Sequence, residues 1–237
     1  MTLLFNLYVD DLLCELEASK LGCCIKDIYV CCSMYADDIL LLSASVVTLQ
    51  SMLSICSEYG RKHDIIFNCK KSMCMAVGFK WKTAISPMLL DDVPIPWVKS
   101  IKYLGIVLVA GISMHVDCGY IKRKFYASYN YIAKCKNADE FVKLSLVKSM
   151  CLPLLTYCLG ALDLPQYKVR DLGTCWNDSF RKIFHFNRWE SVPEIQHYCG
   201  ELSFVGMYNK YKEKFLSSII STHYYPACIR IWTWIDK

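Results

Sequence analysis

Residues 28–42 are Ile28-Tyr29-Val30-Cys31-Cys32-Ser33-Met34-Tyr35-Ala36-Asp37-Asp38-Ile39-Leu40-Leu41-Leu42, two short apolar runs separated by two adjacent carboxylates. The first run is rich in β-branched and aromatic residues, so the pattern predicts a hairpin over about 28–44. Two ionised carboxylates at the tip of an apolar hairpin are costly unless a positive charge meets them. Magnesium binds one or two protein carboxylates together with waters and phosphate oxygens, so Asp37 and Asp38 suit two-metal phosphoryl transfer.

An Asp-Asp pair alone is weak evidence, because a solvated turn explains most such pairs, and this chain has two more. Asp10 and Asp11 lie in an apolar pattern that favours a helix over residues 3–17. Asp91 and Asp92 precede a segment with two prolines, 93–96, which predicts a turn. Only the pair at 37–38 has predicted strands on both sides.

Four blocks of the chain stand out: Leu4-Phe5-Asn6-Leu7-Tyr8-Val9-Asp10-Asp11-Leu12, Tyr35-Ala36-Asp37-Asp38-Ile39, Phe67-Asn68-Cys69-Lys70-Lys71-Ser72 and Lys102-Tyr103-Leu104-Gly105-Ile106. In order and spacing they resemble the reverse transcriptase of non-LTR retrotransposons of the LINE type (jockey-like). A weaker resemblance continues through Cys151-Leu152-Pro153-Leu154-Leu155-Thr156-Tyr157 and Phe180-Arg181-Lys182-Ile183-Phe184. The resemblance implies an RNA-directed DNA polymerase, a nucleotidyltransferase that extends a primer 3′ end by two-metal catalysis.

The resemblance also implies the fold. We expect an α+β protein, with a partial polymerase palm over 1–112 and an all-helical thumb or connection region over 117–237. The palm would be an antiparallel sheet with packed helices, containing the Tyr-Ala-Asp-Asp hairpin, the helix after it and a primer-grip hairpin.

The catalytic residues implied by the resemblance are Asp37, Asp38 and Lys71. Asp37 would bridge Mg²⁺ ions, or Mn²⁺ in their place, and Asp38 would assist or orient. A lysine near the metals can give the leaving pyrophosphate a proton or a charge. A solvated turn lysine is the alternative for Lys71.

The primer-binding residues implied by the resemblance are Tyr35, Ala36, Tyr103 and Gly105. Tyr35 and Ala36 would shape the floor under the primer terminus, and Tyr103 and Gly105 would belong to the primer grip. Glycine lets a backbone approach a partner closely, although Gly105 relieving a tight hairpin is an equal alternative. The partners would be an RNA template and a DNA primer, held through backbone and 2′-OH contacts.

The family takes another metal-binding Asp from a strand earlier than the first block. We therefore expect a truncated polymerase that lacks the upstream palm and fingers and is inactive alone. Whether a longer product supplies that Asp, and the oligomeric state, are open.

Composition favours an intracellular protein, nuclear or cytoplasmic, without a membrane partner. The longest uncharged stretch, near 149–162, falls short of the ~20 residues that a spanning helix needs. The start lacks the basic region of a signal peptide. The 15 cysteines lie in apolar runs, which is typical of buried reduced thiols.

Charge is unevenly divided along the chain. Residues 1–116 carry 10 Lys and Arg against 11 Asp and Glu, whereas residues 117–237 carry 17 against 11. Basic helices would suit the phosphate backbone of a duplex. Two alternatives follow, a non-catalytic retroelement remnant that binds nucleic acid through its basic half, and a helical interaction module with an accidental Asp-Asp.

Local patterns predict the remaining elements. Strands are expected over 73–78 and 101–109. Helices are expected from Ser43 or Ser45 to about Arg61, over 121–132, over 141–162 with a kink at Pro153, over 169–183 and over 204–219. Capping boxes are expected at 137–140 and at 191–194, the second followed by a helix that ends before Gly200.

Overall fold

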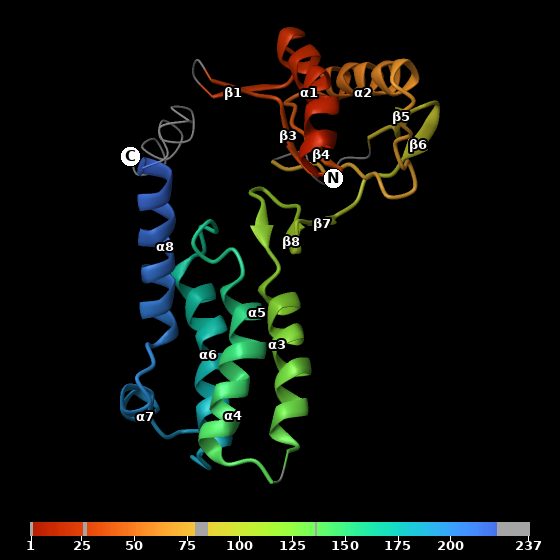
Figure 1. Ribbon diagram of the computed structural model, residues 1–237. Coiled ribbons are helices and arrows are strands. Elements are labelled where there is room, and N and C mark those ends of the chain that lie inside the picture. Colours follow the sequence, from red (N-terminus) through yellow and green to blue (C-terminus); the bar gives the residue numbers. More distant parts are fainter. Residues whose placement is uncertain (1, 26–27, 79–84, 136, 222–237) are drawn as a thin grey trace. The chain divides into compact units, whose positions relative to one another are not determined.

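The computed structural model describes residues 2–25, 28–78, 85–135 and 137–221, and it shows two compact units (Figure 1). The first comprises Met1–Tyr103 and Leu108–His115, and the second comprises Leu104–Val107 and Val116–Lys237. Small antiparallel hairpins and helices make up the first, and helices dominate the second. The predicted α+β class is confirmed.

Helices α1 (Thr2–Ala18) and α2 (Val46–Lys62) frame the first unit. Its two-stranded sheets pair β1 (Cys23–Ile25) with β2 (Ile28–Val30), β3 (Cys32–Tyr35) with β4 (Asp38–Leu41), and β5 (Met88–Leu90) with β6 (Val93–Ile95). A three-stranded sheet, in the order β7 (Ser100–Tyr103), β8 (Ile106–Val109) and β9 (His115–Val116), follows along the chain.

The core of the first unit forms where α1 and α2 bury their apolar faces. The helical spacing of Leu12 and Leu16 on α1, and of Met52, Cys56 and Tyr59 on α2, turns these side chains to one side, and all are buried. The Tyr59 hydroxyl donates to the Tyr8 carbonyl at 2.8 Å and ties the helices together. The helices predicted over 3–17 and to about Arg61 are confirmed.

Gly22 explains how the Tyr-Ala-Asp-Asp hairpin meets α1. Its φ of +119° is open to glycine, and a Cβ there would lie 2.7 Å from the Cβ of Cys31 and 2.9 Å from the Leu42 carbonyl oxygen. The Leu42 N–H donates to the Cys31 carbonyl at the base of the hairpin. The turn after α1 can therefore press against the hairpin only because residue 22 lacks a side chain.

Two strand predictions are wrong. Over 73–78 the described backbone forms only one isolated bridge, between Cys74 and Trp97, because the segment has one short partner instead of a neighbouring strand. The expected strand 101–109 is a hairpin, β7 and β8. Leu104 and Gly105, with φ of 44° and 84°, turn the chain back where an extended residue would continue it.

The helices of the second unit surround one core (Figure 1). They are α3 (Cys118–Ala133), α4 (Glu140–Leu146), the π-helix η1 (Val147–Cys151), α5 (Leu152–Thr156), α6 (Gln166–Ile183), α7 (Pro193–Tyr198) and α8 (Phe204–Ser221). Trp176 and Phe180 of α6 and Phe125 of α3 are fully buried in this core. Residues 222–237 of the predicted helical region lie outside the described residues.

The long helix predicted over 141–162 is interrupted. Pro153 cannot donate the N–H that an α-helix needs, and a π-helical turn precedes it, as happens where the i→i−4 ladder is broken. The helical segment then ends at Thr156, short of Leu162. The expected kink thus takes the form of a widened turn.

The two predicted capping boxes do not form. Asp139 and Val192, rather than Asn137 and Ser191, occupy the N-cap positions, and neither makes a side-chain cap bond. Leu144 of α4 and Val192 before α7 are buried in the core, and Pro193 suits the first turn of α7, which favours these start points. None of the helices in the ranges described above has the length and apolarity needed to cross a bilayer.

Candidate functional site

The β3–β4 hairpin holds the two carboxylates at its tip. Tyr35 pairs with Asp38 across the strands, and Ala36 and Asp37 form the two-residue turn between them. Ala36 has a φ of 52°, which few non-glycine residues adopt but which the primed hairpin turns need. The predicted hairpin is therefore confirmed over residues 32–41, with the acidic pair at its apex. Residues 28–30, expected to begin its first strand, form β2 and pair with β1 instead.

Alternation along the hairpin separates a core face from a solvent face. Cys32, Ile39 and Leu41 pack on the core of the first unit. Tyr35, 65% exposed, lies on the opposite face beside exposed Asp38. One-residue register shifts would reverse the faces, so burial of the apolar set fixes the outward position of this pair.

Both carboxylates are exposed to solvent. Among the described residues, neither has a salt-bridge partner, and no three His, Cys, Asp or Glu side chains lie close enough to hold a metal ion. The expected desolvation cost of the pair therefore does not arise in this chain. Two hard oxygen donors at one tip still fit magnesium, which keeps waters and takes few protein ligands.

Lys71 lies in a turn built by Asn68. The Lys71 N–H donates to the Asn68 carbonyl at 3.0 Å and to its side-chain oxygen at 3.2 Å, and the Ser72 hydroxyl donates to the same carbonyl. An asparagine side chain closes such turns because it mimics the backbone. The Lys71 side chain is exposed. Among the ion pairs of the described residues, none links Lys71 to Asp37 or Asp38.

Tyr103 and Gly105 lie at the turn between β7 and β8. Tyr103 is half-buried at the end of β7, and Gly105 is exposed in the turn. The sequence interpretation gave no role to Tyr157, which contacts this turn: its hydroxyl donates to the Leu104 carbonyl at 2.9 Å. The one hint was that the weaker resemblance ends on this tyrosine, since no periodicity links residues so far apart.

The other two Asp-Asp pairs, at 10–11 and 91–92, adopt the structures that the sequence predicted. Asp10 and Asp11 are exposed on α1. Asp91 and Asp92, with φ of 50° and 60°, form the turn between β5 and β6. Only the pair at 37–38 combines a hairpin tip with a Tyr-Ala sequence before it.

Comparisons with known proteins match the part of the chain that contains these residues. The reverse transcriptase family (RNA-dependent DNA polymerase) matches residues 2–108, which contain the hairpin, Lys71 and Tyr103. The chain is also 27% identical over 195 residues to a retrovirus-related Pol polyprotein from the type-1 retrotransposable element R2 of Popillia japonica. That alignment covers 78% of this chain and 26% of the relative, so the chain spans about a quarter of the relative's length.

Proposed function

We propose that this chain forms the metal-binding part of an RNA-directed DNA polymerase of the non-LTR type, because the reverse transcriptase family matches residues 2–108 and the chain is similar to the R2 Pol polyprotein. Reverse transcriptases are nucleotidyltransferases that use divalent metal ions, an RNA template and a primer. The solvent-facing Asp37 and Asp38 at the β3–β4 tip are the observation that carries the proposal.

Asp37 and Asp38 would hold Mg²⁺, with Mn²⁺ as a substitute, through their carboxylate oxygens. Bound there, the metal would supply charge stabilisation to the transferring phosphoryl group and acidify the primer hydroxyl. The residues themselves contribute a fixed position. The turn at Ala36 and the Tyr35–Asp38 pairing orient the carboxylates away from the core.

The remaining roles follow the same blocks of sequence. Tyr35 and Ala36 would form the floor under the primer terminus. Lys71 would stabilise the departing pyrophosphate. Asn68 would position Lys71 by closing the turn that holds it. Tyr103 and Gly105 would contact the primer backbone, for which an exposed glycine leaves room.

We further propose that catalysis needs a carboxylate from outside the described residues. Two-metal catalysis clamps its metals from two sides, and the acidic groups described here supply one side. Within the described part, β3 and β4 pair only with each other, so the hairpin edges have unused backbone donors and acceptors that suit neighbouring strands. We propose that a separate segment supplies this carboxylate, so that this chain by itself is inactive.

Primer extension on an RNA template tests the function. The chain alone, with Mg²⁺ or Mn²⁺, should incorporate no nucleotide, and adding the upstream palm and fingers segment of an R2-type relative in trans should restore incorporation. Asp37→Asn should abolish the restored activity. Activity of the complemented enzyme that survives Asp37→Asn would refute the metal role of the hairpin.

A second candidate is a protein that binds nucleic acid without catalysis, through the basic half of the chain. The excess of Lys and Arg over residues 117–237 favours it, and exposed Lys210 and Lys214 on α8 contribute. Such binding should weaken steeply with salt. Steep salt dependence in a chain that no upstream segment can activate would favour this candidate.

A further inference from the structure

The turn 187–190, which follows the end of α6 at Ile183 after residues 184–186, places a tryptophan in solvent. Trp189 is 83% exposed, although an indole is among the largest apolar side chains and most often packs in a core. Arg188, next to it in the turn, is exposed as well. An exposed tryptophan needs an explanation when the backbone beneath it is tightly held.

Several hydrogen bonds hold that backbone. The Phe186 N–H donates to the Arg181 carbonyl at 2.8 Å and closes the end of α6. The Asn187 N–H and side-chain amide donate to the two Glu190 carboxylate oxygens at 2.5 and 3.2 Å, and the Glu190 N–H donates back to the Asn187 carbonyl. The turn is therefore closed by its own first and last residues.

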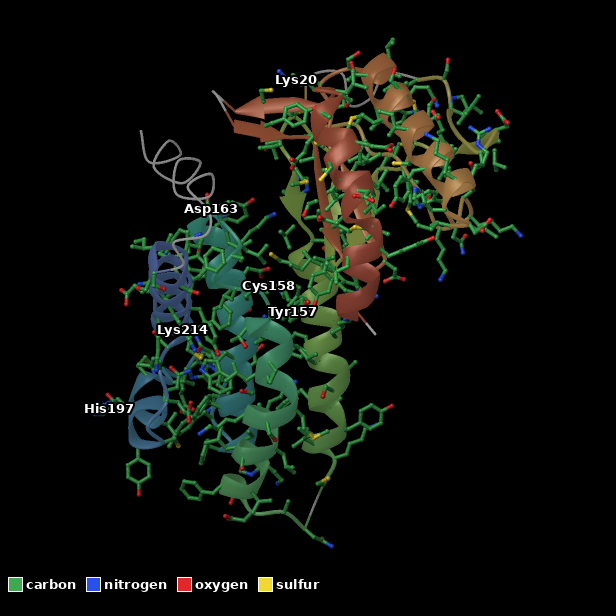
Figure 2. The ribbon with its side chains drawn as sticks, turned by 45° about the horizontal axis from the view of Figure 1, so that its top comes forward. Lys20, Tyr157, Cys158, Asp163, His197 and Lys214 are labelled. Carbon is green, nitrogen blue, oxygen red and sulfur yellow. The ribbon has the colours of Figure 1, made fainter. Side chains whose placement is uncertain are left out.

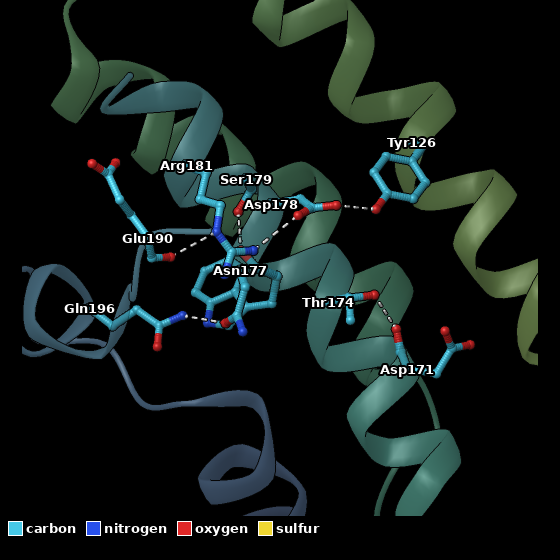
Figure 3. Close-up of polar contacts among 10 residues, drawn as sticks. Tyr126, Asp171, Thr174, Asn177, Asp178, Ser179, Arg181, Glu190 and Gln196 are labelled. Atoms are coloured by element: carbon cyan, nitrogen blue, oxygen red, sulfur yellow. Dashed lines mark hydrogen bonds and ion pairs between the residues drawn. The ribbon is translucent and has the colours of Figure 1, made fainter. Parts of the chain in front are cut away.

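Arg181 fastens the turn to the helices (Figure 3). Its Nε donates to the Glu190 carbonyl at 3.1 Å, and its guanidinium pairs with Asp178 at 3.2 Å. Asp178 in turn accepts a hydrogen bond from the Tyr126 hydroxyl on α3 at 2.9 Å. Trp189 thus projects from a turn that is anchored to both α6 and α3.

The cation next to Trp189 is Arg188, which is exposed and makes no ion pair within the described ranges. Arg181 is paired with Asp178, and Lys182 lies over the rings of Tyr126 and Tyr129. Glu190, which follows Trp189, directs both carboxylate oxygens to Asn187. A flat aromatic ring beside an exposed arginine suits a base and its phosphate, since base–aromatic stacking tolerates any base and Arg attracts the backbone.

We propose that Trp189 is a stacking platform for an unpaired nucleotide, with Arg188 contacting the adjacent phosphate. The proposal rests on the proposed function, because it assumes that the chain acts on nucleic acid, and it adds a single-strand site apart from the metal-binding hairpin. An indole can stack on a base only when that base is not already stacked on both sides. Single strands should therefore bind here, and duplexes should not.

The proposal can be tested by measuring, through fluorescence anisotropy, how tightly the full chain binds a labelled oligouridylate of about twelve nucleotides. Trp189→Ala should lower the affinity about fivefold to a hundredfold, and Trp189→Phe should restore much of it. Asn187→Ala, which opens the turn, should give a smaller loss. Tyr131→Ala is the matched control, because Tyr131 is 78% exposed on α3 outside the turn, and it should change nothing.

Two further probes distinguish failure of the stacking proposal from failure of the proposed function. An RNA–DNA hybrid duplex should bind wild type and Trp189→Ala equally, and an oligodeoxythymidylate shows whether the site prefers RNA. Equal single-strand affinity of wild type and Trp189→Ala would overturn the stacking site while leaving the proposed function intact. If the wild-type chain does not bind the RNA–DNA hybrid duplex, the result would count against the proposed function itself. A dimer that Trp189→Ala dissociates, with no loss of oligouridylate affinity, would show that the ring contacts protein instead.

Discussion

The Tyr157 hydroxyl donates a hydrogen bond to the Leu104 carbonyl, at 2.9 Å and across 53 residues of sequence. The same ring lies under Gly105, since a Cβ there would be 3.2 Å from Tyr157 Cε1. Figure 2 labels Tyr157 where the chain leaves α5. The turn that we propose to grip the primer is thus held by a side chain at the end of a helix, and both residues of the contact belong to the second unit.

Gly105→Ala should destabilise this turn by about 1–3 kcal/mol, because alanine resists a φ of 84° and its Cβ meets the Tyr157 ring. Urea unfolding and the affinity for an RNA–DNA hybrid measure the effect. In a Tyr157→Ala background the steric part should vanish and leave only the backbone strain. An identical penalty in both backgrounds would show that the ring contact contributes nothing.

Asp37→Asn and Asp38→Asn should each weaken Mn²⁺ binding at the hairpin tip and leave stability within about 0.5 kcal/mol, because both carboxylates are exposed. Paramagnetic broadening of amide resonances near residue 37 reports the binding. The matched control is the exposed pair on α1, changed as Asp10→Asn with Asp11→Asn. Equal loss of broadening in control and test variants would show that Mn²⁺ follows net charge alone.

Lys71→Ala should slow nucleotide incorporation by the complemented polymerase about 10²- to 10⁴-fold, if Lys71 supplies a proton or a charge to pyrophosphate. Stability should not change, because the side chain is exposed. Lys70→Ala, one residue earlier and also exposed, should retain activity. Single-turnover incorporation separates chemistry from binding, and equal rates for the two variants would remove Lys71 from the mechanism.

Gly22→Ala should unfold the hairpin or cost more than about 2 kcal/mol, since the new Cβ would meet Cys31 and the Leu42 carbonyl. Gly78→Ala is the matched control. Gly78 also has a positive φ, 109°, but no described residue lies within 4 Å of its added Cβ. Thermal unfolding should show a clearly larger loss for Gly22→Ala, and similar losses would mean that backbone strain alone matters at both sites.

The buried thiol of Cys56 should make the protein less stable at alkaline pH. Burial raises the pKa of its thiol from 9.0 to about 12, so the unfolded chain ionises first as the pH rises. The contribution of Cys56 to the free energy of unfolding should be constant below about pH 9 and should then fall, by up to about 1.4 kcal/mol per pH unit, until about pH 12. Urea midpoints for Cys56→Ala should fall less steeply over this range. Cys14→Ala, which removes an exposed thiol, should match wild type.

Much of the fold follows from local pattern, and the errors have physical causes. The hairpin at Asp37 and Asp38 and the helix before it were predictable, because alternation and helical spacing are set by the residues themselves. The strand over 73–78 was not, because a strand exists only where a partner pairs with it. The turn at Leu104 was hidden, because leucine rarely adopts a positive φ.

The sequence by itself determined that an acidic pair stands at the tip of an apolar hairpin within a reverse-transcriptase-like order of blocks. Only the tertiary structure decided that both carboxylates face solvent, that Tyr157 holds the turn at Leu104, and that Arg181 anchors the turn below Trp189. The reason is one of range. Periodicity and turn chemistry act over a few neighbouring residues, whereas burial and these contacts depend on how whole helices pack.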